Sequence, residues 1–116
     1  MSLMWEQVTI EATDPTDLGR WWAEALHWVV VDDDPPVFEI RPSEHEVPGL
    51  LFLPAGGAKS VKNRLHLDLR PDDQAAEVGR LLTLGATRVD IGQGDVPWVV
   101  LADPEDNEFC VLGGAT

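Results

Sequence analysis

The side chains most able to do chemistry lie in one short segment of the second half. His66 and Asp68 alternate with leucines, so on a β-strand both would project from the same face. There His66 could serve as a general base or metal ligand, and Asp68 could accept a hydrogen bond from a substrate hydroxyl or amine. The alternative is a polar pair held by neighbouring strands for folding alone, because buried polar groups need partners in either case.

The single thiol of the chain is a second candidate. Cys110 alternates with Phe109 and Val111, which places its side chain on the opposite face of a strand from theirs. A thiol becomes nucleophilic when a cation or a helix N-terminus lowers its pKa, and the sequence shows neither beside it. A buried, unreactive thiol is therefore the favoured interpretation. One cysteine also excludes an internal disulfide bond.

Aromatic and polar residues elsewhere could complete a binding surface. The chain has 5 tryptophans and no tyrosine, and Trp98 begins an apolar run beside the strand expected for Cys110. With Phe52, Trp98 could form the wall of a pocket for a flat or apolar ligand. Gln7 and Thr9 alternate with apolar residues on the first expected strand, so both should face the same pocket.

Such residues need elements to position them, and the first half predicts one helix and four strands. Asp14 suits a helix N-cap and Pro15 the first helical position, and apolar residues follow at helical spacing until His27. Strands are expected where apolar residues alternate with polar ones or form short runs between turns. They are Trp5–Glu11, Trp28–Asp32, Val37–Arg41 and Gly49–Leu53.

The second half repeats this order. A strand over Arg64–Leu69 precedes Asp72 and Asp73, which open a helix that Gly85 can close. A tight turn over Asp103–Asn107 is expected before the last strand. The three remaining strands are Thr87–Ile91, Trp98–Ala102 and Glu108–Leu112.

Matching positions in the two halves indicate an internal duplication. At a nearly constant offset Gln7 matches His66, Leu26 matches Leu84 and Phe52 matches Cys110. We therefore predict an α+β fold in which two tandem βαβββ modules pair into a cup-shaped sheet with the helices outside. Residues 1–116 would form a single domain, with module one at 5–53, a connector at 54–63 and module two at 64–113. A ferredoxin-like sandwich is less favoured because each of its halves carries two strands.

Composition limits the partners. The chain has 8 Lys and Arg against 21 Asp and Glu, which gives a formal net charge of -13. That charge repels nucleic-acid phosphates and anionic lipids, and no apolar run is long enough for a transmembrane helix. We expect a cytoplasmic protein with no nucleic-acid or membrane partner. Because so small a protein has strand edges to cover, we also expect a homodimer.

Three segments together resemble a known family. They are Asp14-Pro15 before Trp21-Trp22-Ala23, the strand Lys62-Asn63-Arg64-Leu65-His66-Leu67-Asp68-Leu69, and Ala102–Cys110 with its Asp-Pro-Glu-x-Asn turn. In this combination the chain resembles the vicinal oxygen chelate superfamily, which includes glyoxalase I, extradiol dioxygenases, and fosfomycin- and bleomycin-resistance proteins. The resemblance covers nearly the whole chain and implies the glyoxalase/bleomycin-resistance fold.

The resemblance also implies where a divalent metal would bind, with two ligands from each half. The corresponding positions are Gln7, Phe52, His66 and Cys110. Only His66 is a usual ligand at its position, since Phe52 has no lone pair and Cys110 replaces the expected acid. No cofactor is therefore expected; if a divalent metal does bind, its ligands would be His66, Cys110 and Gln7.

Two functions fit these residues. The first is a metal-independent protein that binds or sequesters a small molecule, a metabolite or an antibiotic, at a degenerate metal site. Its binding surface would consist of Gln7, Thr9, Phe52, His66, Asp68, Trp98 and Cys110. The second is a lyase, isomerase or dioxygenase of the same superfamily that uses an unusual metal, or His66 and Asp68 as acid and base. Fold resemblance does not choose between them.

Overall fold

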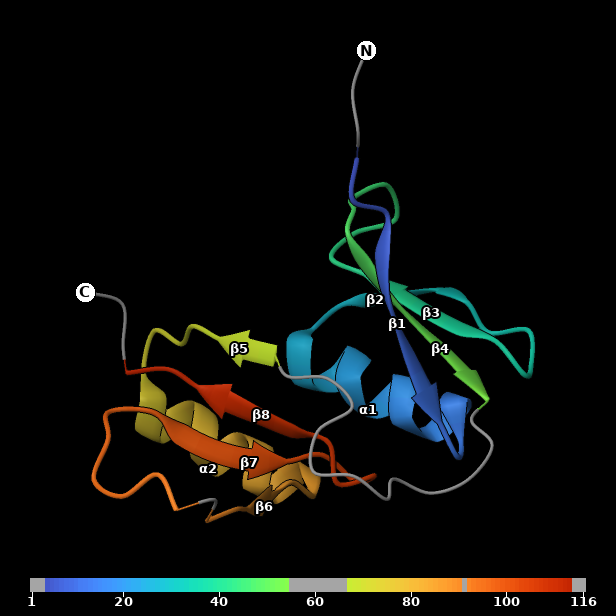
Figure 1. Cartoon of the computed structure of the whole chain (residues 1–116). Coiled ribbons are helices and arrows are strands. Elements are labelled where there is room, and N and C mark those ends of the chain that lie inside the picture. Colours follow the sequence, from blue (N-terminus) through green and yellow to red (C-terminus); the bar gives the residue numbers. More distant parts are fainter. Residues whose placement is uncertain (1–3, 55–66, 91, 114–116) are drawn as a thin grey trace. The chain divides into compact units, whose positions relative to one another are not determined.

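A computed structural model describes residues 4–54, 67–90 and 92–113 of the chain. The chain divides into two compact units, Met1–Ala58 and Lys59–Thr116. Each unit contains one helix and one four-stranded sheet in the order βαβββ (Figure 1). The predicted α+β class and its two repeated modules are therefore confirmed.

The first unit is a four-stranded sheet with one helix packed against it (Figure 1). Its strand order is β1-β4-β3-β2, with β1 parallel to β4 and the other neighbours antiparallel. Parallel strands cannot be joined by a hairpin, so the intervening helix and strands make the crossover. The elements are β1 (Gln7–Ala12), α1 (Pro15–Leu26), β2 (Val29–Asp32), β3 (Phe38–Arg41) and β4 (Gly49–Pro54).

The core of this unit lies between α1 and one face of the sheet. Ile10, Phe52 and Phe38 are side by side on β1, β4 and β3, and each is at most 2% exposed. Trp22 of α1 is also buried. The helix can approach closely because a side chain at Gly19 would collide with the ring of Phe38. Packing therefore fixes which residues of each strand face the helix.

The second unit repeats the arrangement with shorter strands. Its order is β5-β8-β7-β6, with β5 parallel to β8 and the other neighbours antiparallel. Phe109 and Leu101 pair across β8 and β7 and are almost fully buried, and α2 packs against β8. The elements are β5 (Leu67–Leu69), α2 (Gln74–Leu84), β6 (Thr87–Arg88), β7 (Val99–Ala102) and β8 (Glu108–Val111).

Both helices begin and end as their sequences predict. The side chains of Asp14 and Asp73 accept hydrogen bonds from backbone N–H groups in the first turns of α1 and α2, each at 3.1 Å. Each helix ends at a residue with a left-handed backbone conformation, His27 with φ 57° in α1 and Gly85 with φ 113° in α2. Within the described ranges, no helix has the length and apolar character needed to cross a bilayer.

Candidate functional site

The sheet face turned away from α2 carries two of the residues singled out in the second unit. Asp68 on β5 is paired with Cys110 on β8, which in turn is paired with Val100 on β7, so the three side chains form one row. Asp68 is exposed, whereas Cys110 is 5% exposed. The strand pairing thus brings together a carboxylate and a thiol that are far apart in sequence.

The surroundings of Cys110 keep its thiol protonated. Burial is the largest influence that raises the pKa of Cys110, followed by the charge of Asp68, a hydrogen bond with Asp68, and the charge of Glu108. All of these favour the neutral S–H form over the thiolate. Since the thiolate is the nucleophilic and metal-binding form, this environment supports an unreactive cysteine.

In the first unit, the sheet face turned away from α1 carries Gln7 and Thr9. Gln7 is half-buried and Thr9 is exposed, both on β1. Thr9 is paired with Leu51 on β4, which is the same relation that Asp68 has to Cys110 in the second unit. The alternation in the sequence therefore placed the polar side of β1 correctly.

The expected position of Phe52 on this face is wrong. Phe52 is 0% exposed and packs with Ile10 and Phe38 beneath α1. The residue of β4 that shares a face with Gln7 and Thr9 is Leu51. The offset that takes Gln7 to His66 also takes Leu51 to Cys110, so the match of Phe52 with Cys110 is displaced by one residue.

His66 and Trp98 are the two other predicted site residues. His66 lies outside the described residues. Trp98 directly precedes β7 and is 38% exposed.

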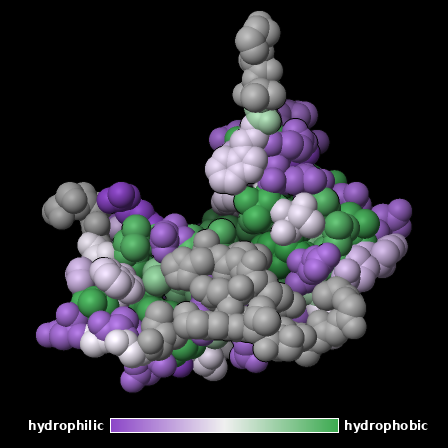
Figure 2. All heavy atoms as spheres, viewed as in Figure 1, coloured by the Kyte–Doolittle hydropathy of each residue, from purple (hydrophilic) through white to green (hydrophobic). Residues whose placement is uncertain are grey.

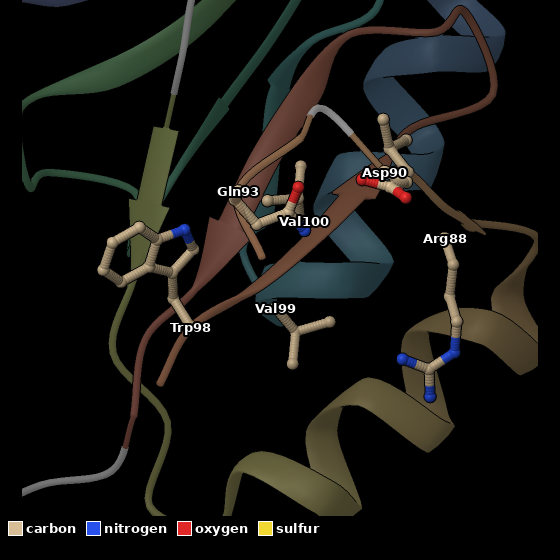
Figure 3. A pocket seen from close by; sticks show the side chains of 7 residues that line it. Arg88, Asp90, Gln93, Trp98, Val99 and Val100 are labelled. Atoms are coloured by element: carbon tan, nitrogen blue, oxygen red, sulfur yellow. The ribbon is translucent and has the colours of Figure 1, made fainter. Parts of the chain in front are cut away.

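A cavity of about 380 Å³ lies beside Trp98, within the size range of small-molecule sites. Trp98 and Arg88 lie at opposite ends of the lining side chains, with Gln93, Val100 and Asp90 between them (Figure 3). Together they offer an indole face, a guanidinium, a carboxylate and an amide. Its described lining is Arg88, Val89, Asp90, Gln93, Trp98, Val99 and Val100.

The cavity exists because β6 pairs with β7 over only two residues, Thr87 and Arg88. The N–H of Val89 still donates to the carbonyl of Val100 at 3.1 Å, but β6 itself ends at Arg88. A turn follows, in which the Asp90 carboxylate accepts a hydrogen bond from the N–H of Gly92 at 2.8 Å. Gly92 has φ 82°, which suits glycine. The loop therefore diverges from β7 and leaves space between them.

The sequence did not indicate that Arg88, Asp90 and Gln93 would line this cavity. The strand expected over Thr87–Ile91 was too long, which would have paired this segment along β7. The signal that could have found them is the sequence Gly92-Gln93-Gly94, because two glycines in three residues are typical of a loop.

The described residues do not fit the metal site that the superfamily resemblance implies. On β4 the site-facing residue is Leu51, which has no donor atom, and Cys110 is held as a neutral thiol beside two carboxylates. Among the residues described, no three His, Cys, Asp or Glu side chains gather around a position for an ion. Of the described residues at the four expected ligand positions, only Gln7 has an oxygen donor.

Comparison with known proteins agrees with this fold. The trypanothione-dependent glyoxalase I of Leishmania major has a TM-score of 0.73 at 15% identity, over 97% of this chain and 87% of that chain. TnmS3, an antibiotic-binding protein from Streptomyces sp. CB03234, has a TM-score of 0.64 at 19% identity, over 99% and 98%. The oxidase ChaP-H2 has a TM-score of 0.68 at 17% identity, over 99% and 96%.

Sequence comparison identifies the family directly. No curated protein matches the chain. A family model described as a glyoxalase-like domain matches residues 7–112, nearly the full length. The chain therefore belongs to the glyoxalase-like domain family of the vicinal oxygen chelate superfamily.

Proposed function

We propose that this protein binds or sequesters a planar small molecule, a metabolite or an antibiotic, without a metal ion. The observation that carries the proposal is the cavity beside Trp98. An indole face offers stacking area to a flat ligand, and the polar groups around it offer hydrogen bonds that fix the orientation of that ligand. TnmS3, a protein of similar fold, is described as antibiotic-binding.

Asp68 is the proposed polar anchor of the ligand. Val100 lines the cavity and lies in the same row of side chains as Cys110 and Asp68. Neighbouring strands are about 4.8 Å apart, so Asp68 lies about 10 Å from Val100 along the sheet, within reach of a ligand of two or three fused rings. Its exposed carboxylate could accept a charge-assisted hydrogen bond there.

The test is a screen of planar, metabolite-like aromatics by quenching of tryptophan fluorescence, followed by titration of variants. Trp98→Ala removes the stacking surface and should weaken binding strongly. Asp68→Asn should weaken binding by about 1.5–3 kcal/mol, which is roughly ten- to a hundred-fold. The matched control is Asp72→Asn, which removes an exposed carboxylate beyond β5 and should leave the affinity unchanged.

Three results would contradict the proposal. The first is binding that survives both Trp98→Ala and Asp68→Asn unchanged, and the second is the absence of any fluorescence response across the screen. Elemental analysis of protein purified without chelator should show far less than one metal ion per chain. The third contradicting result is therefore near-stoichiometric iron, nickel, manganese or zinc that is lost in His66→Ala, which would favour a metal-dependent enzyme.

A further inference from the structure

Gln74 connects the start of α2 to the ends of two other segments. It is the first residue of α2, directly after the N-cap Asp73. Its side-chain Nε2 donates toward three backbone carbonyl oxygens, those of Pro97 at 2.8 Å, Val111 at 3.1 Å and Leu112 at 3.2 Å. An amide nitrogen carries two hydrogens, so the three acceptors share them, and Pro97 has the shortest distance.

Pro97 is contacted by the first residue of α2 and by the residues that follow β8. Proline has no N–H, so its carbonyl is its only backbone hydrogen-bonding group, and Gln74 provides a donor for it. On another side Pro97 is met by Gly113, where an added Cβ would lie 3.0 Å from the Pro97 carbonyl oxygen and 3.3 Å from its Cβ. The end of β8 and the start of α2 therefore together fix the position of Pro97.

The segment before Pro97 contains glycines, which restrain its backbone less than other residues would. Gly92 and Gly94 have φ values of 82° and 71°, in the left-handed region that glycine enters freely. Because glycine has many accessible backbone conformations, contacts outside the segment contribute to fixing its course. The segment begins after β6 and ends at Pro97, the residue that precedes Trp98.

We propose that Gln74 is a positioning residue for the cavity, because its amide holds Pro97 and thereby sets where the indole of Trp98 stands as the cavity wall. Gln74 does not line the cavity itself. The proposal rests on the proposed function for the ligand that Trp98 would meet, whereas the placement of Trp98 can be measured without any ligand.

The experiment uses the whole protein labelled with 5-fluorotryptophan and observed by ¹⁹F NMR. The Trp98 resonance is the one lost in Trp98→Phe. Gln74→Leu removes both N–H donors, and Gln74→Glu keeps the shape of the side chain but presents carboxylate oxygens to three carbonyl oxygens. In both variants the Trp98 resonance should shift or broaden, while the four other tryptophan resonances keep their positions.

Asp73→Ala is the matched control at the same end of α2. It removes the cap hydrogen bond to the N–H of Ala76 and should lower the Tm, yet it does not touch Pro97. The Trp98 resonance should therefore stay in place in Asp73→Ala. The proposal is wrong if Trp98 is unmoved in the folded Gln74 variants, or if Asp73→Ala moves it equally.

The outcomes separate this proposal from the proposed function. A Trp98 resonance that moves in the Gln74 variants, in a protein that binds no planar ligand, supports the positioning and contradicts the proposed function. Ligand binding by the wild-type protein together with an unmoved Trp98 resonance does the reverse.

Discussion

Cys110 illustrates how the neighbours of one residue decide its chemistry. Its thiol lies on the sheet face turned away from α2, where burial and the carboxylates of Asp68 and Glu108 raise its pKa. A thiol in this environment neither attacks an electrophile nor ligates a metal readily at neutral pH. The row of Asp68 and Cys110 is therefore better suited to hydrogen bonding than to covalent chemistry.

The titration of Cys110 tests this environment. Asp68→Asn removes a negative charge that opposes the thiolate, so the pKa of Cys110 should fall and the titration midpoint should move to lower pH. Because the chain has one cysteine, a ¹³Cβ-cysteine label gives a single resonance whose shift follows the titration. Asp72→Asn serves as the control. An unchanged midpoint in Asp68→Asn would show that the carboxylate does not act on the thiol.

Individual side-chain directions were predictable only where local alternation decides them. Gln7 and Thr9 lie on the side of β1 that the sequence indicates, because a strand turns successive side chains to opposite faces. Phe52 was misplaced because its position was taken from a match between the halves, and a difference of one residue reverses the face of a strand. Three cavity residues were missed because the early end of β6 depends on a loop.

At the level of elements, the turn between β7 and β8 is built around one buried carboxylate. Asp103 is 3% exposed, and its Oδ1 accepts hydrogen bonds from the N–H groups of Glu105 at 2.9 Å and Asn107 at 3.0 Å. The side-chain amide of Asn107, itself 2% exposed, donates to the same carboxylate. The turn joins the two central strands of the second sheet and so sets their register.

Asp103→Ala should therefore destabilise the protein by about 2–3 kcal/mol, because hydrogen bonds to a charged group are lost and the buried Asn107 amide loses this carboxylate as an acceptor. Urea unfolding followed by circular dichroism measures the change. Asp106→Gly in the same turn is the control, since Asp106 has φ 67° and glycine adopts that conformation at no cost. A loss in Asp103→Ala no larger than in Asp106→Gly would mean that the turn does not depend on this carboxylate.

Elements were predicted more reliably than their lengths. Caps and turns have local sequence signals, so both helices and the Asp103–Asn107 turn lie where the sequence indicates. β6 was expected to reach Ile91 but ends at Arg88, because a strand continues only as far as its neighbour pairs with it. Pairing is a property of the tertiary structure, and the sequence of one strand does not contain it.

At the scale of the whole molecule, charge and apolar surface act in opposite directions on self-association. The chain carries a formal net charge of -13, and hydrophilic side chains are visible over the surface of both units (Figure 2). Like charge on two copies opposes their contact. Apolar side chains are nevertheless exposed on an edge strand: Val29 and Val30 of β2 are 44% and 43% exposed. An uncovered edge of this kind is a surface for pairing with another strand.

We expect the protein to be a homodimer that uses the β2 edge, and salt to strengthen it by screening the repulsion. Light scattering at micromolar concentration should give twice the mass of the chain. Val30→Lys places a charge on the edge and should shift the protein to monomers, because edge lysines oppose strand pairing. Thr83→Lys adds the same charge to the exposed side of α2 and should leave the dimer intact. A wild-type monomer, or equal dissociation by both lysine variants, would show that β2 does not form the interface.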